Sequence, residues 1–192
     1  VWLDKRFLTH PRLERKLKQV AEQGGQIRAF QSLPDTFSMG TTRFELIYPR
    51  IKHGLGEGHS TNQRSLVFRI EEGRNSLLLT GDLDAAMEKR ILKSLKPTQL
   101  LKVAHHGSIT SSSAPFLDKV QPCLAVVSAG QSGQELFPHA SVVRRFEDRQ
   151  VAFFQTSLSG ALRFRAQPGG WLVESSLGLS ESLQCESRDS KG

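Results

Sequence analysis

Cysteine is scarce in this chain, and its placement argues against one class of metal site. The 192 residues contain only Cys123 and Cys185, which lie far apart and form no C-x-x-C pair. A zinc site built from thiolates needs closely spaced cysteines, so we expect no such site. One disulfide between the two residues is compatible with the sequence but not required by it, and the redox compartment stays open.

Nucleotide-binding loops and long apolar runs are lacking as well. Without a Walker-type loop or a G-x-G-x-x-G run, we expect no nucleotide cofactor. No stretch approaches the roughly 20 apolar residues that a membrane-spanning helix needs. The first residues include Asp4, Lys5 and Arg6, which is not the pattern of a signal peptide. Since the chain starts without Met and in mid-pattern, we expect it to be a piece of a longer protein.

Negative charge is the minority charge in this sequence. The chain holds 26 Lys and Arg against 19 Asp and Glu, a net charge of +7. This balance favours an anionic partner such as nucleic acid, although a basic surface can also serve solubility alone. Hydrophobic residues make up 38% of the chain and include 11 Phe, which is enough for the core of one domain of this length.

The spacing of apolar residues predicts strands that alternate with helices, which is typical of the α/β class with layered packing. We expect helices over residues 11–23, 84–95 and 140–149, with a short one starting near Ala114. Expected strands cover residues 41–48, 65–70, 76–80, 100–104, 124–128, 151–154 and 160–164, with a further one at 171–173. From Ser175 onward the sequence is rich in Ser and charge. We therefore predict one domain over 1–174 and a polar, disordered tail over 175–192.

Metal-binding side chains follow two of the expected strands, at the point where each strand ends. Asp82 comes directly after an apolar strand and Gly81, and His105 and His106 follow the next strand, before another glycine. Open α/β sheets collect ligands at the carboxyl ends of their strands. Carboxylates and imidazoles are ligands of borderline and hard divalent metals. The sequence therefore predicts that Asp82, His105 and His106 converge on a shared cation.

Structural roles for these residues stay open at this point. Asp82 or Asp84 could cap the helix that follows, and two adjacent histidines are often surface or core residues. The hydroxyls of Ser108 and of residues 110–113 could donate to a substrate phosphate, or they could cap the helix that starts near Ala114. A His-His-Gly-Ser run after one strand, downstream of Gly-Asp after another, is less common by chance than either feature alone.

Several short motifs together resemble one family. In order along the chain they are Asn62-x-x-Ser65-Leu66-Val67, Leu79-Thr80-Gly81-Asp82-Leu83, Leu101-Lys102-Val103-Ala104-His105-His106-Gly107-Ser108, Ala125-Val126-Val127-Ser128-Ala129-Gly130, Pro138-His139 and Ser159-Gly160-Ala161-Leu162-Arg163-Phe164. As a set, they resemble the metallo-β-lactamase domain of ComEC-type DNA-uptake proteins of naturally competent bacteria. The resemblance reaches to about residue 166, and each motif alone is weak.

This resemblance implies a metallo-β-lactamase-type αββα sandwich and a role for each site residue. Asp82 would bridge two divalent metal ions, Zn or Mn, and His106 would be a further ligand with His105 lining the site. The sequence itself leaves open which of the two histidines binds. His139 would contact a phosphate oxygen or a leaving group beside the pocket. Ser108 and Ser111 would donate hydrogen bonds to the substrate phosphate.

The chain departs from the family pattern in one important respect. The family's His-x-His-x-Asp-His motif, which supplies most metal ligands, is absent, and Phe137 replaces the first histidine of a His-Pro-His run. We interpret His10 as part of a helix start, and His53 and His59 as solvated residues of a glycine-bearing loop. The expected fold is therefore an incomplete sandwich, the C-terminal portion of the domain. We expect it to be inactive alone, as a fragment or as a truncated version.

The implied function is a metal-dependent phosphodiester hydrolase, a DNA nuclease that serves DNA uptake in natural transformation. Its partners would be single-stranded DNA and the membrane channel portion of the same parent chain, with this domain outside the bilayer on the extracytoplasmic face. Two alternatives are a non-catalytic DNA-binding scaffold and a small-ester hydrolase of the same fold. Basic side chains expected along the DNA backbone are Arg12, Lys16, Arg144, Arg145, Arg149, Arg163 and Arg165.

Overall fold

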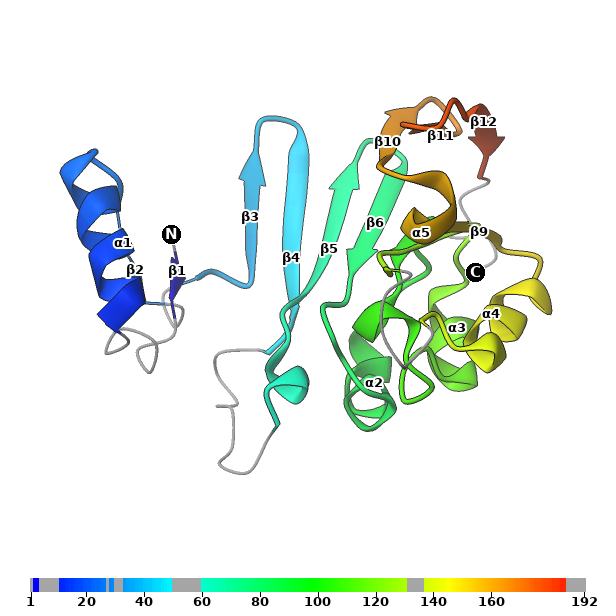
Figure 1. Cartoon of the computed structure of the whole chain (residues 1–192), viewed down its shortest axis with the longest axis horizontal. Helices are drawn as coiled ribbons and strands as arrows, with labels where there is room; N and C mark the ends of the chain where they lie inside the picture. The colour runs from blue at the N-terminus through cyan, green and yellow to red at the C-terminus, as the bar shows by residue number, and fades with distance from the viewer. Residues whose placement is uncertain are drawn as a thin grey trace. The chain divides into compact units, whose positions relative to one another are not determined.

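A computed structural model describes residues 2–3, 11–26, 28–29, 33–49, 60–130 and 137–185 (Figure 1). The chain divides into two compact units, Val1–Asp35 and Thr36–Gly192. The first unit contains β1 (Trp2–Leu3), which pairs in parallel with β2 (Arg28–Ala29), and α1 (Pro11–Glu22). The helix confirms the expectation for residues 11–23. Within the described ranges, no helix is long and apolar enough to cross a membrane.

The second unit is built on a mixed sheet of seven strands in the order β3-β4-β5-β6-β7-β8-β9 (Figure 1). The strands are β3 (Thr36–Met39), β4 (Thr42–Tyr48), β5 (Val67–Glu72), β6 (Asn75–Leu79), β7 (Leu100–Lys102), β8 (Leu124–Val127) and β9 (Ala152–Gln155). Neighbours from β3 to β6 run antiparallel, and those from β6 to β9 run parallel. The strands expected at residues 65–70 and 76–80 are β5 and β6, which form an antiparallel hairpin.

Helices connect the parallel strands and cover one face of this sheet, as right-handed crossovers require. They are α2 (Ala85–Ile91), which continues into the turn η5 (Leu92–Ser94), α3 (Ala114–Val120) and α4 (Ala140–Glu147). Met87, Phe116 and Phe146 from the helices pack with Leu101 and Val127 from the strands in one buried core. The predicted α/β class with layered packing is therefore confirmed.

A second, antiparallel sheet covers part of the opposite face. It consists of β10 (Leu162–Gln167), β11 (Gly170–Ser175) and β12 (Ser180–Gln184), and a short helix, α5 (Thr156–Ser159), precedes it. Trp171 and Val173 pack with Leu100 and Leu124 of the large sheet. Strands β7 and β8 are therefore covered on both faces, which explains why they read as continuous apolar runs.

The predicted disordered tail from Ser175 is wrong for residues 175–185. Strand β12 pairs with β11 along its whole length, and Leu183 of β12 packs on the core of the small sheet. Cys185 is buried and forms a disulfide with Cys123, with the two Cα atoms 6.0 Å apart. The serine-rich composition concealed this strand because Leu183 is its single apolar residue, while Ser180 and Ser182 are exposed. The fold thus continues beyond the predicted boundary at residue 174.

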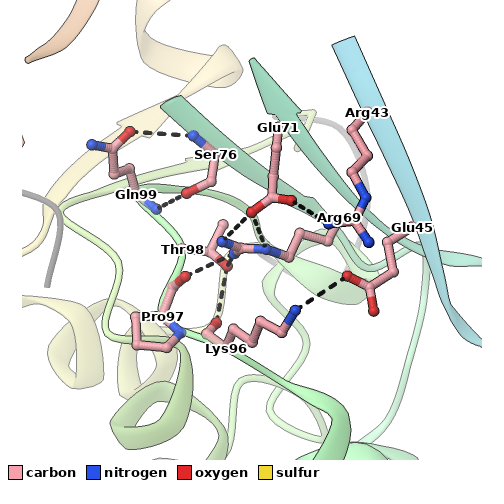
Figure 2. A network of polar contacts seen from close by, with 9 residues as sticks. All are labelled: Arg43, Glu45, Arg69, Glu71, Ser76, Lys96, Pro97, Thr98 and Gln99. Carbon is pink, nitrogen blue, oxygen red and sulfur yellow. Dashed lines mark hydrogen bonds and ion pairs between the residues drawn. The ribbon is translucent and has the colours of Figure 1, made fainter. Parts of the chain in front are cut away.

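A polar network fastens the amino ends of β6 and β7, as Figure 2 shows. Arg69 of β5 is 4% exposed and donates hydrogen bonds to the Glu71 carboxylate, to the Pro97 carbonyl (2.7 Å) and to Thr98 Oγ1 (2.5 Å). Beside it, the backbone N–H of Gln99 donates to Ser76 Oγ at 3.1 Å. These contacts lie where β6 and β7 begin, and the register of the two strands, which pairs Leu79 with Lys102, determines where their carboxyl ends lie.

Candidate metal centre

The carboxyl ends of β6 and β7 lie side by side, because the strands are parallel neighbours that pair Leu79 with Lys102. Asp82 follows β6 by three residues, and His105 follows β7 by three. A direct hydrogen bond joins the two loops, from the backbone N–H of His105 to the Gly81 carbonyl at 3.1 Å. The structure therefore brings the two predicted ligand-bearing loops together.

The His106 ring faces Asp82. Its Nδ1 lies 2.6 Å from the Ser128 carbonyl, which can only accept, so in the neutral ring Nδ1 carries the proton and Nε2 keeps a free lone pair. That Nε2 lies 4.0 Å from Asp82 Oδ1. Metal bonds to histidine nitrogen and carboxylate oxygen are each about 2.0–2.2 Å long, so one ion can reach both atoms. Ligating histidines commonly hold their second ring nitrogen in this way.

The Asp82 carboxylate does not cap helix α2, because another residue does. The N-cap of α2 is Asp84, whose Oδ1 accepts from the Met87 backbone N–H at 3.0 Å. The second carboxylate oxygen of Asp84 accepts from Gln63 Nε2 at 2.8 Å. Asp82 uses its backbone N–H to donate to Ser65 Oγ at 2.9 Å, and its side chain is 43% exposed. The structure thus assigns the capping role to Asp84.

His105 does not join His106 and Asp82. Its Nε2 lies 3.2 Å from Asn62 Nδ2, and its Nδ1 is buried with no hydrogen-bond partner among the described residues. Within the part of the chain that the structure describes, no group of three or more His, Cys, Asp or Glu side chains could hold a metal ion. The expected convergence of all three side chains is therefore reduced to the pair of Asp82 and His106.

The turn that carries both histidines is strained. His105 (φ 48°) and His106 (φ 53°) in the turn η6 (Ala104–Gly107) both have left-handed backbone, which costs a non-glycine residue roughly 1–2 kcal/mol. Gly107 follows at φ +79°, and a Cβ there would lie 2.5 Å from Pro138 Cβ. Such conformations persist only where the surroundings specify them, and they cluster at functional sites.

The serine loop after this turn is held from within. Ser111 is fully buried, and its Oγ lies 3.0 Å from the Ala104 carbonyl and 2.9 Å from the Ser108 carbonyl. Its hydroxyl therefore donates to nearby backbone carbonyls earlier in the chain. The structure does not bring Ser111 to the surface of the site. Ser108 is also buried, with its Oγ 3.1 Å from Thr110 Oγ1. The N-cap of α3 is Ser113, whose hydroxyl makes no capping bond, so the hydroxyl cap considered from sequence is not formed.

His139 lies beside the histidine turn, as the motif order implied. Its backbone N–H donates to the Gly107 carbonyl at 2.9 Å, and it is the N-cap of α4. Its Nδ1 accepts from the Ser141 backbone N–H at 3.2 Å. When the ring is neutral, this acceptor role places the proton on Nε2, which leaves an exposed N–H donor.

The segment before β5 supports the candidate site, a role that was not predicted from the sequence. Asn62, in the turn η4 (Asn62–Arg64), contacts His105, while Ser65 accepts from Asp82 and leaves no room for a Cβ at Gly81. Tyr48 Oη donates to the Gln63 carbonyl at 3.0 Å, and burial raises the pKa of Tyr48, which keeps this hydroxyl protonated. The Asn-x-x-Ser spacing was the available signal.

Lys102 places a cation near the carboxylate of Asp82. By strand alternation, its side chain points to the face opposite Leu101, and it is half-buried. Burial lowers the pKa of Lys102, while the negative charge of Asp82 acts in the opposite direction. A partly desolvated ammonium group beside the candidate ligands is suited to an anionic substrate.

The basic residues expected along DNA divide into two groups. Three of them make internal contacts: Arg145 with the Ser111 carbonyl (2.8 Å), Arg149 with Asp118 (2.7 Å) and Arg165 with Glu174 (3.0 Å). The side chains of Lys16, Arg144 and Arg163 are exposed. The side chain of Arg12 and the residues His10, His53 and His59 lie outside the described part, so the expectations about them stay predictions.

Comparisons with known sequences find relatives among bacterial competence proteins. The chain is 39% identical over 102 residues to Recombination protein 2 of Haemophilus influenzae, which covers 53% of this chain and 13% of that protein. It is 35% identical over 130 residues to Competence protein ComA of Neisseria gonorrhoeae, covering 66% and 18%. It is 28% identical over 165 residues to ComE operon protein 3 of Bacillus subtilis, covering 85% and 21%. The chain therefore spans between 13% and 21% of the length of these relatives.

Solved structures give more distant likenesses, and no family model matches the chain. One is a protein of Parabacteroides distasonis described as a metal-dependent hydrolase, with 12% identity and a TM-score of 0.44 over 73% of this chain and 61% of that one. Another, from Thermotoga maritima, is described as a Zn-dependent hydrolase of the metallo-β-lactamase superfamily, with 14% identity and a TM-score of 0.41 over 68% and 73%. On its sequence relatives, this chain is a homologue of the ComEC-type competence proteins, the family that its motifs indicated.

Proposed function

We propose that this chain contributes part of a divalent-metal site to a metallo-β-lactamase-type phosphodiester hydrolase that acts on DNA within a ComEC-type competence protein. The orientation of His106 carries this proposal. Its Nδ1–H donates to the Ser128 carbonyl, and its free Nε2 faces Asp82 Oδ1 at 4.0 Å. The homology to competence proteins supports a role in DNA uptake.

Asp82 and His106 fit a metal ion of the Zn or Mn class as part of its ligand set. A catalytic zinc typically has three protein ligands, so the described residues supply fewer than one complete site. The other ligands would come from outside the described residues, and Asp82 would be among the residues that hold the two ions in the intact domain. A bound metal would lower the pKa of its water to about 7 and so make hydroxide available at neutral pH.

The side chains around this pair would bind and orient the phosphodiester. The exposed Nε2–H of His139 would donate to a phosphate or leaving-group oxygen, as its position beside Gly107 supports. Lys102 would neutralise part of the phosphate charge. The exposed Arg144 and Arg163 would contact the DNA backbone farther from the site. The Ser108 hydroxyl, 3.1 Å from Thr110 Oγ1, would donate only after rotating away from that partner.

The disulfide supports a location on the extracytoplasmic side of the membrane, with the parent protein as the anchor. Cys123 and Cys185 are joined, and disulfides persist in oxidising compartments but are rare in the cytosol. Labelling of free thiols in denatured protein from the bacterial envelope, with and without reductant, tests this location. We expect labelling of both cysteines only after reduction, and labelling without reductant would place the domain in a reducing compartment.

A titration of the chain with Mn²⁺, followed through paramagnetic broadening of amide signals, tests the metal site. We expect the strongest broadening near Asp82 and His106, and its loss in Asp82→Ala and His106→Ala. Asp118→Ala is the control, because this carboxylate is also exposed but pairs with Arg149 away from the site. Unchanged broadening in Asp82→Ala, or broadening centred elsewhere, would contradict the proposal.

A second candidate function is a non-catalytic DNA-binding domain, favoured by the missing third ligand among the described residues. Cleavage of single-stranded DNA and of small esters by the parent protein, with Mn²⁺ or Zn²⁺, separates the two functions. The nuclease proposal predicts metal-dependent DNA cleavage that Asp82→Ala abolishes. The second candidate predicts binding that weakens with salt at a slope of about −0.7 per phosphate contacted and does not respond to a chelator.

A further inference from the structure

A buried carboxylate that the proposed chemistry does not use holds the serine loop. Glu88 of α2 is 0% exposed, and its Oε1 accepts from the Ser112 backbone N–H at 2.6 Å. Its Oε2 accepts from the Ser113 backbone N–H at 2.8 Å. A buried charge is costly unless it is paired or hydrogen-bonded, so these two bonds make the placement tolerable. Glu88 therefore anchors the backbone of Ser112 and Ser113, the two residues directly before α3.

Arg145, from another helix, donates hydrogen bonds to the same loop. Its Nη1, projecting from α4, donates to the Ser111 carbonyl at 2.8 Å and to the Ser112 carbonyl at 3.1 Å. Ser112 has left-handed backbone (φ 55°), as do His105 and His106. The loop is thus held by an acceptor from one helix and a donor from another, at the residue whose conformation most needs support.

The loop is tied back to the histidine turn by two further contacts. Ser111 Oγ reaches the Ala104 carbonyl at 3.0 Å, at the start of the turn. The backbone N–H of Ser108 donates to the His105 carbonyl at 2.8 Å, directly across the turn. Because both contacts depend on the position of the serine loop, a movement at Ser112 would be transmitted to His105 and His106.

We infer that Glu88, together with Arg145, is a positioning residue that holds the segment from His105 to Ser113 in the shape that directs His106 toward Asp82. Neither side chain needs to touch a metal or a substrate for this role. The consequence for metal affinity rests on the proposed function, whereas the consequence for the orientation of His106 does not. This distinction allows the two to be tested separately.

The test compares the full chain with Glu88→Gln, Glu88→Ala and Arg145→Met, and uses Ile91→Ala as the matched control. Ile91 lies one turn further along α2 and is also buried, but its side chain cannot hydrogen-bond to the loop. Nitrogen-15 shifts of the His106 ring report the tautomer without metal. Amide exchange at Ser112 and Ser113 reports the loop, and Mn²⁺ titration reports affinity.

We expect the Nδ1–H tautomer of His106 to give way to a mixture in Glu88→Ala and Arg145→Met, with amide exchange at Ser112 and Ser113 at least about 10-fold faster. Mn²⁺ affinity should fall roughly 10- to 100-fold, the usual effect of losing support behind a ligand. Ile91→Ala should keep the tautomer. Glu88→Gln, which retains one acceptor, should give effects between those of the unmutated chain and of Glu88→Ala.

Retention of the tautomer and of slow exchange in the folded Glu88 and Arg145 variants would overturn the inference. An equal change in Ile91→Ala would also overturn it, because general destabilisation would then suffice. Should Glu88→Ala fail to fold, Glu88→Gln and Arg145→Met decide the outcome. If neither this chain nor the full-length protein binds Mn²⁺, the proposed metal site fails, while the tautomer measurement still decides the positioning role.

Discussion

At the scale of single residues, the adjacent His105 and His106 have different chemical roles because their rings meet different partners. The Ser128 carbonyl fixes the tautomer of His106 that leaves Nε2 free for a metal. Asn62 lies within hydrogen-bond distance of Nε2 of His105. Both residues have left-handed backbone. Residues that maintain this backbone should therefore be sensitive to small substitutions.

Substitution of Gly107 by alanine should destabilise the fold more than substitution of another left-handed glycine. A Cβ at Gly107 would meet Pro138 Cβ at 2.5 Å, whereas at Gly40 (φ +60°) nothing lies within 4 Å. Gly40→Ala should cost only the backbone penalty of about 1–2 kcal/mol, and Gly107→Ala should exceed it. Urea denaturation measures both, and equal losses would show that Pro138 moves aside freely.

The pH dependence of stability should carry a signature of Glu88. Burial raises the pKa of Glu88 above its ordinary value of 4.5, while bonds from Ser113 and Ser112 and the charge of Arg145 act in the opposite direction. The folded state therefore binds a proton more readily than the unfolded state, and this contribution to stability is lost as pH rises through the raised pKa.

Glu88→Gln removes this titration. The stability advantage of the unmutated chain over this variant should therefore shrink as pH rises from about 4.5 through the raised pKa. Parallel unfolding curves of the two proteins between pH 4 and 8 measure the difference. A constant difference over this range would show that Glu88 has the same pKa in the folded and unfolded states.

At the scale of elements, Arg69 adds a side-chain link between the β5–β6 hairpin and the segment before β7, beside the backbone pairing of β6 with β7. Its guanidinium binds Glu71 in the hairpin and Pro97 and Thr98 in the segment before β7 (Figure 2). The register of β6 and β7 places the loops that follow these two strands opposite each other. The hairpin is therefore part of the support for the candidate metal centre.

Arg69→Met should destabilise the fold by about 1–3 kcal/mol, because buried acceptors lose their donor. Arg43→Met is the matched control, since Arg43 pairs with the same Glu71 at 3.4 Å but is 51% exposed. Exposed pairs contribute about 0–1 kcal/mol, so this variant should be nearly neutral. Denaturant titration of both variants measures the difference, and comparable losses would mean that only the charge of Glu71 matters.

At the scale of the second unit, three layers are held together partly by a covalent link. The Cys123–Cys185 disulfide connects the start of β8 to the end of β12 across a sequence separation of 62 residues. Gln99 adds to this junction, as its side chain donates to the Cys185 carbonyl at 2.9 Å and accepts from Trp171 Nε1 at 3.3 Å. The end of β12 in the small sheet is thus linked to the start of β8 in the large sheet.

The double variant Cys123→Ser/Cys185→Ser should lose about 4 kcal/mol of stability by the chain-entropy estimate for a loop of this length. Thermal unfolding with and without reductant measures this loss. Reductant should lower the melting temperature of the unmutated chain toward that of the variant, whose own melting temperature should not change. A parent that is unaffected by complete reduction would show that the hydrophobic contacts of Trp171 and Val173 suffice.

The sequence by itself determined the α/β class, most element positions, and the strand ends that carry Asp82, His105 and His106. These features depend on local spacing: apolar periodicity, glycines at turns, and polar residues directly after strands. The homology to competence proteins was likewise readable from short motifs in order. The supporting role of Asn62 and Ser65 was within reach of the same motifs but was not recognised.

Only the tertiary structure decided which histidine faces Asp82, which aspartate caps α2, and whether the polar C-terminal segment forms a strand. The first and the last depend on contacts between residues distant in sequence, His106 with Ser128 and Cys185 with Cys123, whereas the cap is a local contact of Asp84 with Met87 that the sequence left open between two aspartates. The backbone strain at His105 and His106 also has no local signature, because surrounding groups impose it. Local patterns predict where a side chain leaves the backbone, whereas its chemical role depends on partners that only folding brings together.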